Sequence, residues 1–495
     1  MKLWGKVMQL FRRIHQKLNW PIRRYFALIG GILFLTYLGS AVYQVYKPLP
    51  SGLDIKSPPR SSDVEFLSDL TYQDAQGKQH SEQQIFDAML TLIEQAQNTI
   101  VLDMFLFNNE TGSSTIRHRA LTQELTQALI DKRQLNPNID IQLITDPINT
   151  VYGGTDPEHL RRLKAAGINV IYTDLTVLRA SNPAWSGFWY MCCQNLGNSS
   201  TGGWLPNPFG DEKVTLRSYF QLLNFKANHR KTLVVDTLDG WKALVSSANP
   251  HDGSSLHSNV AMILHDKSAI DVLDSERAVA QFSQGDAPMV ILPEPKANPA
   301  LPKVQILTEK AIYEEVLAQI NQLKRNEQLD LMMFYLSDRD IVKAIVAARQ
   351  RGVVVRVVLD PNKDAFGRQK NGIPNRQVAW ELHRQGVPVR WCATNGEQCH
   401  SKLLILGKQT GEKQIILGSA NYTARNLNNY NLETNVSVQA QNNYTAVVQA
   451  QQYFETVWRN PDHEKITVDY AQYKDESSTK YWLYRFMEWS GLSTF

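Results

Sequence analysis

Two histidine–lysine pairs in this 495-residue chain supply the side chains that phosphate chemistry needs. His229 and Lys231 precede a run of apolar or β-branched residues over 232–235. Because strand side chains alternate between faces, the imidazole and the ammonium point the same way. A second strand over 243–245 leads to Asn249. We therefore expect an imidazole, an ammonium and an amide to meet at one end of a sheet, a set suited to a phosphate group.

The same pattern occurs a second time in the chain. Taken alone, the first copy is equally compatible with a core strand that carries a surface histidine. In the second copy, His400 and Lys402 precede the apolar run 403–406 and a strand that ends at Asn421. The histidine and the asparagine are 20 residues apart in the first copy and 21 in the second. Such a duplication is improbable by chance, so it favours a functional site.

The two copies resemble the paired His-x-Lys motifs of the phospholipase D superfamily. The first copy matches the family pattern His-x-Lys-x4-Asp in full, because Asp236 follows Lys231 at the required distance. The second copy departs from it, since Gly407 occupies the position of the aspartate. The resemblance implies that this aspartate braces the motif, so its loss concerns local stability more than chemistry. The resemblance covers most of residues 60–460.

A reaction without a metal or another cofactor is implied by this resemblance. The two lysines and two asparagine amides would neutralise and orient the non-bridging oxygens of a phosphodiester. One neutral histidine attacks phosphorus, and the other, protonated, donates to the leaving alcohol and then activates an incoming alcohol or water. The resemblance assigns His229 as the nucleophile and His400 as the acid and base, while the symmetry of the repeat leaves the reverse assignment open.

Each histidine needs a carboxylate on its other ring nitrogen. Glu433 stands at the family's usual distance after Asn421, and we expect it to serve His400. The aligned position in the first half is His257, which is no carboxylate, although Asp252 is near enough in sequence to substitute. Because a carboxylate stabilises an imidazolium, the expected pairing favours His400 as the acid.

The order of helices and strands predicts an α/β fold in two similar halves. The first half shows alternating helical and strand patterns over 83–97, 99–107, 117–132, 139–146, 157–166 and 167–171. The second half repeats this order over 309–325, 329–336, 338–351, 353–360, 376–384 and 386–389. We expect a duplicated α-β-α sandwich with mostly parallel or mixed sheets, whose pseudo-twofold halves share one site. Asp146 and Asp360, each before a proline at a strand end, are interpreted as cap or turn residues.

Composition divides the chain into further segments. The expected segments are a basic stretch 1–24, a membrane-spanning helix 25–46, a linker 47–63, a first half 64–293, a proline-rich joint 294–303, a second half 304–470 and an aromatic tail 471–495. Residues 175–226 have no counterpart in the second half and are rich in aromatic side chains. This insertion is interpreted as a lid, a lipid-contacting surface or a satellite hydrophobic cluster. The tail could touch the membrane interface or pack on the domain.

The N-terminal segment predicts a membrane anchor. Residues 26–42 carry no charge and just suffice to span a bilayer, and the basic side chains before them favour a cytoplasmic N-terminus. We expect a single-pass helix in the cell membrane, with the catalytic part on the exported (periplasmic or extracellular) side. A cleaved signal peptide is the competing interpretation, since Gly39 and Ala41 could form a cleavage site. Residues 3–18 suggest an amphipathic helix on an anionic membrane surface, with a solvated basic tail as the alternative.

The charge distribution argues against a surface for nucleic acids. The formal net charge is +4, and the first 24 positions hold seven basic residues and no acidic one: Lys2, Lys6, Arg12, Arg13, Lys17, Arg23 and Arg24. The rest of the chain carries 45 basic and 48 acidic side chains, so it is mildly acidic. Such a balance offers little electrostatic attraction to DNA or RNA.

Four cysteines fit an exported domain, where disulfides are permitted. Cys392 and Cys399 are seven residues apart, and a bridge between them would stiffen the loop before His400. Cys192 and Cys193 are adjacent, an arrangement that rarely forms a bond, so a link from one of them to the second half is considered too. A zinc site is less attractive, because the spacing matches no common ligand pattern.

Three classes of function remain. The leading one is a membrane-anchored enzyme that hydrolyses a phospholipid or transfers its phosphatidyl group to an alcohol, as cardiolipin synthases do. Its partners would be the phospholipid, the membrane and an alcohol or water acceptor. The alternative is an exported nuclease or other phosphodiesterase, for which Arg217, Lys226 and Arg230 supply a modest basic cluster. The third is a non-catalytic binding module at the membrane, which two intact His-x-Lys pairs argue against.

Overall fold

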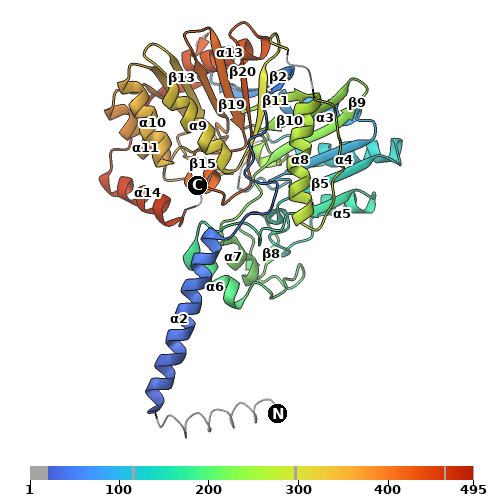
Figure 1. Ribbon diagram of the computed structural model, residues 1–495, viewed down its shortest axis with the longest axis vertical. Helices are drawn as coiled ribbons and strands as arrows, with labels where there is room; N and C mark the ends of the chain where they lie inside the picture. Colours follow the sequence, from blue (N-terminus) through green and yellow to red (C-terminus); the bar gives the residue numbers. More distant parts are fainter. Residues whose placement is uncertain (1–19, 114–116, 295–297, 462–463, 494) are drawn as a thin grey trace.

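The computed structural model describes residues 20–113, 117–294, 298–461, 464–493 and 495. The expected amphipathic helix within 3–18 and part of the expected joint 294–303 lie outside the described residues. Two mixed sheets with helices on their faces form the globular part, and one long helix projects from it (Figure 1).

Each half of the chain builds one sheet. The first has the strand order β3-β2-β11-β10-β9-β4-β5-β6 and the second the order β1-β12-β20-β19-β18-β13-β14-β17-β21. The first-half strands are β2 (Val64–Gln73), β3 (Gln79–Glu82), β4 (Thr99–Met104), β5 (Asp140–Thr145), β6 (Asn169–Tyr172), β9 (Lys231–Thr237), β10 (Gly240–Ser246) and β11 (Asn259–His265). The second-half sheet contains β1 (Arg60–Ser61), β12 (Lys303–Thr308), β13 (Gln328–Met333), β14 (Val354–Leu359), β17 (Val389–Cys392), β18 (Lys402–Gly407), β19 (Glu412–Gly418), β20 (Thr434–Gln441) and β21 (Thr467–Asp469).

Seven strands recur in the same order in both sheets. The order β2-β11-β10-β9-β4-β5-β6 corresponds to β12-β20-β19-β18-β13-β14-β17. In each sheet the last three of these strands are parallel to one another, and the other neighbours are antiparallel. The predicted duplicated α/β fold with mixed sheets is confirmed.

The helices cover both faces of these sheets. Those of the first half are α3 (Ile85–Gln95), α4 (Leu121–Leu135), α5 (Glu158–Ala165) and α8 (Asp266–Phe282). Those of the second half are α9 (Lys310–Gln322), α10 (Arg339–Gln350), α11 (Asn375–Arg384), α12 (Ala424–Leu427), α13 (Thr445–Arg459) and α14 (Ser478–Ser490). Side chains of α8 and α13 share one hydrophobic core with strands of both sheets, so the central core joins the halves.

Strand β9 shows why the strands that follow the two histidines, β9 and β18, are continuous apolar runs in the sequence. Val234 faces the central core, whereas Leu233 and Val235 face the outer core beneath α3 and α4. Since both faces of the strand are buried, both alternating sets of side chains must be apolar. The strand therefore positions the residues that precede it as a rigid, fully packed element.

The segment expected as a linker, 47–63, joins the second sheet at its end. Residues Arg60 and Ser61 form the edge strand β1 beside β12, and Lys56 pairs with Leu307. The chain thus passes from α2 (Ile22–Tyr46) over the second half before it builds the first. Helix α2 is long and apolar enough to cross a membrane by length and composition.

The insertion 175–226 forms a small subdomain beside α2. It contains α6 (Pro183–Cys192), α7 (Leu216–Leu222) and the two-stranded sheet of β7 (Leu205–Pro206) and β8 (Lys213–Val214). Asn182 caps α6 by accepting a hydrogen bond from the Trp185 amide, and Pro183 fits the first turn. Figure 1 shows this subdomain at the end of the globular part from which α2 emerges.

Both cysteine pairs form disulfides. Cys392 at the end of β17 is bonded to Cys399, the residue before His400, as the spacing predicts. Cys192 and Cys193 are bonded to each other, so the considered link to the second half is not formed. The first of these bridges ties the approach to His400 to a sheet strand.

Candidate active site

The two halves bring the two histidines together at the centre of the molecule. His229 precedes β9, and its amide donates to the Leu432 carbonyl of the other half at 2.9 Å. His400 precedes β18, and its amide donates to the Ser258 carbonyl at 2.8 Å. Each histidine is therefore held by the opposite half. Both are buried, at 8% and 6% exposed, and belong to one shared site.

A phenylalanine covers each histidine–lysine pair. The Phe105 ring lies 4.7 Å from the His229 ring, and the Lys231 ammonium lies 4.9 Å from the centre of Phe105. In the second half, Phe334 lies 4.8 Å from His400 and 5.1 Å from the Lys402 ammonium. These two aromatic residues were not among the predicted site residues. The dipeptide Met-Phe stands at the end of both β4 and β13 and could have revealed them.

The carboxylate of Glu433 lies on His229. Its two oxygens are 2.9 and 3.0 Å from His229 Nδ1. The Ser419 hydroxyl and the Asn426 amide also donate to this carboxylate. The prediction that Glu433 serves His400 is wrong, because the strand that carries Glu433 reaches across the interface between the halves. Asp252 does not substitute at His229, since it accepts a hydrogen bond from the Thr122 amide.

Asn259 occupies the equivalent position at His400. The two halves share a backbone hydrogen bond: the Ser419 amide donates to the Thr434 carbonyl, and the Ser247 amide donates to the Val260 carbonyl. Thr434 and Val260 are therefore equivalent, and so are the residues before them, Glu433 and Asn259. The alignment of Glu433 with His257 is therefore wrong by two residues. His400 Nδ1 donates to the Ser247 carbonyl at 3.0 Å and to Asn259 Oδ1 at 3.2 Å. One histidine thus has a carboxylate partner, and the other has two neutral oxygens.

These contacts leave the Nε2 atoms of both histidines available. Within the described ranges, neither Nε2 atom of His229 and His400 has a hydrogen-bond partner. Because Nδ1 of each ring faces acceptors, it carries the proton of the neutral ring, and Nε2 carries the lone pair. Two imidazoles with free Nε2 atoms in one buried site can serve as nucleophile and proton carrier.

The two lysines and two asparagines stand around the histidines. Lys231 Nζ donates to the His229 carbonyl, and Lys402 Nζ donates to the His400 carbonyl at 2.8 Å. Asn249 Oδ1 accepts from the Leu106 amide at 3.4 Å, which leaves its NH₂ group without a partner among the described residues. Asn421 has a buried Oδ1 that lacks a partner in the same part of the chain. The Asn249 NH₂ group and the buried Asn421 oxygen are therefore both available to a polar ligand.

Three aspartates brace the motifs. Asp236 accepts hydrogen bonds from the amides of Asn98 and Thr99, where β4 begins. Asp146 accepts from the Ile148 and Asn228 amides, and Asp360 accepts from the Asn362 and Cys399 amides. The last two therefore cap turns, as expected, and in addition hold the residue before each histidine.

Gly407 has no bracing side chain, and neighbouring residues fill its place. Lys413 Nζ donates to Gln328 Oε1 at 2.7 Å beside it. A Cβ atom at residue 407 would lie 2.6 Å from Lys413 Nζ and 3.2 Å from Gln328 Cβ. This polar pair therefore fills the space beside residue 407.

Burial and mutual repulsion lower the basicity of the site. Burial lowers the pKa of His229 to about 4 although the Glu433 carboxylate opposes this, and it lowers the pKa of Lys231 to about 7. Burial, and then the Lys402 charge, hold the pKa of His400 well below its usual range. The pKa of Lys402 is lowered by burial and by Lys231. The site therefore holds fewer protons than its residue types suggest, and an anion would raise all four pKa values.

We expect anion binding at this site to take up protons. With a pKa of about 7, the free Lys231 loses its charge as the pH rises through 7, and a bound anion favours its charged form, so affinity should fall as pH rises. Titration calorimetry with sulfate, which does not titrate in this range, in buffers of different ionisation enthalpy measures the uptake. The variant Lys231→Met should bind sulfate more weakly and take up fewer protons, whereas a pH-independent affinity of the unmodified protein would contradict the expectation.

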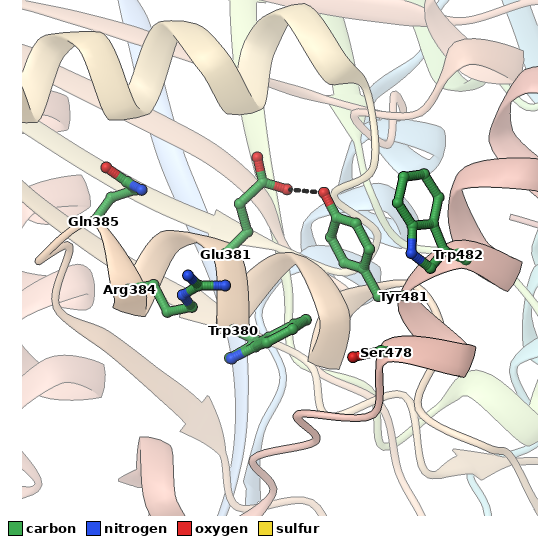
Figure 2. Close-up of a pocket in the computed structure, with 7 residues that line it drawn as sticks. All are labelled: Trp380, Glu381, Arg384, Gln385, Ser478, Tyr481 and Trp482. Atoms are coloured by element: carbon green, nitrogen blue, oxygen red, sulfur yellow. Dashed lines mark hydrogen bonds between the residues drawn. The ribbon is translucent and has the colours of Figure 1, made fainter.

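A separate surface cavity of about 300 Å³ lies between α11 and α14 (Figure 2). Its lining residues are Trp380, Glu381, Arg384, Gln385, Ser478, Tyr481 and Trp482. None of them belongs to the two motifs. The Tyr481 hydroxyl contacts Glu381 across the cavity at 3.3 Å, and Glu381 also pairs with Arg339. The cavity is therefore a feature of the α14 packing and not part of the candidate site.

Comparison with known proteins agrees with this architecture. Residues 316–458 match the profile of the family described as "Cardiolipin synthase, PLD-like domain". The sequence has no significant match among curated proteins. Phosphatidylserine synthase from Haemophilus influenzae Rd KW20 superposes with a TM-score of 0.54 at 11% identity, over 88% of this chain and 95% of that one.

Two other solved structures are more distant. Polyphosphate kinase from Porphyromonas gingivalis has a TM-score of 0.44 at 13% identity, over 87% of this chain and 54% of that one. The phospholipase D family member Nuc from Salmonella typhimurium has a TM-score of 0.26 at 24% identity, over 33% of this chain and 97% of that one. The matched stretch therefore identifies a phospholipase D-like domain in the second half, which carries His400 and Lys402, and the fold of the whole chain is similar to that of the phosphatidylserine synthase.

Proposed function

We propose that this protein is a membrane-anchored enzyme that processes phospholipids, by hydrolysis or by transfer of a phosphatidyl group to an alcohol. The observation that carries the proposal is the pair of free Nε2 atoms flanked by two buried lysines, in a chain with one long apolar helix. The match of the second half to a cardiolipin synthase-type domain supports a lipid substrate.

The proposed reaction proceeds in two displacements at phosphorus. His229 Nε2 attacks the phosphorus atom, and the bond to the leaving alcohol breaks as that oxygen takes a proton from His400 Nε2. The phosphatidyl group is then bonded to His229, and His400 is neutral. The acceptor, an alcohol or water, gives its proton to His400 as its oxygen attacks phosphorus and releases His229. Lys231, Lys402 and the amides of Asn249 and Asn421 stabilise the charge on the non-bridging oxygens.

The Glu433 contact supports His229 as the nucleophile for a reason other than the expected one. The carboxylate accepts a hydrogen bond from Nδ1–H, which fixes the tautomer with a lone pair on Nε2. It also offsets the positive charge that the imidazole gains when it bonds to phosphorus. His400, which faces neutral oxygens, is protonated only when an anionic substrate is bound.

The basic cluster expected for the alternative function, a nuclease, does not form a surface. Arg230 is fully buried and pairs with Glu276 and Glu309, and the buried Lys226 donates to the Leu178 carbonyl and the Tyr190 hydroxyl. Of the three residues expected to form the cluster, only Arg217 remains partly exposed. These side chains do not form a groove for a polyanion.

The substrate class is tested with the purified full-length protein in phospholipid vesicles. We expect release of the headgroup alcohol from phospholipid, with formation of phosphatidic acid or of a transfer product when glycerol or phosphatidylglycerol is supplied. Single-stranded DNA should remain intact under the same conditions. Cleavage of DNA without turnover of lipid would favour the alternative function.

The covalent intermediate is expected on His229. Protein mixed with substrate, quenched under conditions that preserve phosphoramidates and digested, should carry the phosphatidyl or phosphoryl group on the peptide with His229. Mass spectrometry of the two histidine peptides provides the measurement. The group on the His400 peptide would reverse the two roles and leave the reaction class unchanged.

The catalytic part is proposed to lie on the exported side of the membrane. The basic residues before α2 and the disulfide next to His400 support this orientation. We expect a reporter enzyme that works only outside the cytoplasm to be active when fused after residue 300. A fusion at the same residue that is silent, while a cytoplasmic reporter there is active, would contradict the orientation.

A further inference from the structure

Helix α6 of the insertion packs along the second half of α2. The Tyr37 hydroxyl donates to the Ala184 carbonyl at 3.0 Å, and the Ser40 hydroxyl donates to the Gly187 carbonyl at 3.0 Å. A Cβ atom at Gly187 would lie 2.8 Å from the Ala41 Cβ, so the absence of a side chain permits the close approach. Small residues at such contacts are typical of helix pairs in membranes.

These contacts fix the depth of α6 relative to α2. Tyr37 lies nine residues before the end of α2 at Tyr46, which corresponds to about 14 Å along the helix axis. The contacts at Tyr37, Ser40 and Ala41 therefore lie in the last third of the apolar stretch 26–42. Helix α6 itself has no charged residue, and it exposes Phe188 at 47% and Met191 at 39%. Its composition fits a hydrocarbon environment and not an aqueous one.

We propose that α6 is seated in the outer leaflet beside α2 and that its exposed face contacts lipid acyl chains. The inference rests on the proposed role of α2 as the membrane anchor. It assigns the aromatic insertion to the membrane surface, in preference to a lid or a satellite core. Ser40 and Ala41 form tertiary contacts, which cleavage after Ala41 at the alternative signal-peptide site would remove.

The end of helix α14 lies beside the start of α6. Trp482, Phe486 and Trp489 lie on one face of the helix at helical spacing and are 67%, 51% and 82% exposed. Gly491 directly follows α14 and abuts Ser181, two residues before α6. Figure 1 shows α6 and α14 at the side of the globular part that faces α2. Tryptophan side chains at this level suit the interface between headgroups and water.

The membrane-facing helix is connected to the candidate active site. The Ser186 hydroxyl donates to Asn224 Oδ1 at 2.9 Å, and the Asn182 amide donates to the Leu223 carbonyl at 3.0 Å. Lys226, three residues before His229, donates to the Tyr190 hydroxyl at 2.8 Å. The depth of α6 in the leaflet therefore determines how far from the membrane the segment before His229 lies. A lipid headgroup would reach the site from the leaflet and not from solution.

Photo-crosslinking in vesicles tests this placement with the full-length protein. A photoreactive amino acid is introduced at Phe188, at Leu35 of α2 as the membrane reference, and at Leu238, which is 87% exposed in the β9–β10 turn. We expect phospholipid adducts at positions 188 and 35 and none at 238. The adducts should persist in the His400→Ala background, which separates the placement from catalysis.

A second variant tests the contact between the helices. Gly187→Leu places a side chain against the Ala41 backbone, within about 3 Å, and should separate α6 from α2. We expect severalfold less adduct at position 188 in this variant and an unchanged adduct at 35. Adducts at position 35 without one at 188, or equal adducts at 188 and 238, would overturn the placement of α6 and leave the membrane anchor standing. Absence of adducts at both 35 and 188 would overturn it together with the anchor, whatever the outcome of the turnover assay.

Discussion

Replacing either His229 or His400 by alanine is expected to reduce phospholipid turnover by at least about a thousandfold. Each change removes an imidazole that makes a bond to phosphorus or carries a proton to and from the reacting oxygen. Headgroup release from vesicles, followed over several hours, provides the measurement. His383→Ala is the matched control, because this histidine is exposed on α11 and stacks on Tyr470 far from the motifs; it should retain normal turnover.

The double variant extends this prediction. Because the two histidines act in one reaction, the loss of both should be hardly worse than the loss of either. Substantial turnover in one single variant would mean that the halves work separately. This outcome would contradict the shared site that the crossed contacts of His229 and His400 suggest.

Glu433→Gln is expected to reduce turnover by about a hundredfold or more while the fold is retained. The amide nearly preserves the shape of the side chain, but its oxygen is a neutral acceptor for the Nδ1–H group and cannot offset the charge on His229. Thermal unfolding and turnover are measured together, so that a loss of stability is recognised. Glu158→Gln, an exposed residue in the first turn of α5, is the control.

The pH dependence of this variant distinguishes orientation from folding. Burial opposes a charged Glu433, whereas His229 and Lys231 lower its pKa, so the carboxylate is ionised across the neutral range. Its removal takes away a negative charge, and the pKa of Lys231 should fall further. Sulfate affinity should then decline at a lower pH than in the unmodified protein. An unchanged rate and an unchanged pH profile would exclude a role for the carboxylate.

The sequence was sufficient to predict the elements that repeat. Every helix and strand expected from alternating periodicity is present, with boundaries that differ by a few residues, because those patterns reflect burial within each half. The two His-x-Lys pairs and the asparagines could also be predicted, since each stands at the end of an apolar strand. The edge strand β1 could not, because its pairing partner lies more than 240 residues away.

The carboxylate partner shows where sequence reasoning fails. Glu433 is closer in sequence to His400 than to His229, and proximity along the chain suggested the wrong pairing. Only the packing of the two sheets brings β20 of one half to the approach of β9 in the other. The correspondence of Asn259 with Glu433 likewise follows from the hydrogen bonds to the Val260 and Thr434 carbonyls. Those hydrogen bonds cannot be predicted from the amino-acid sequence alone.

Because each histidine is held by residues of the opposite half, the two halves of this site can differ in sequence. Two identical subunits that met in this way would form a dimer with the same residue on both sides, so both imidazoles would share one environment. Covalent linkage of the halves removes that constraint, because each copy can change alone. Glu433 against Asn259, and Asp236 against Gly407, are differences that two identical subunits could not hold. Expression of the two halves as separate chains should therefore yield a working enzyme only as a mixed pair, and neither half with a copy of itself.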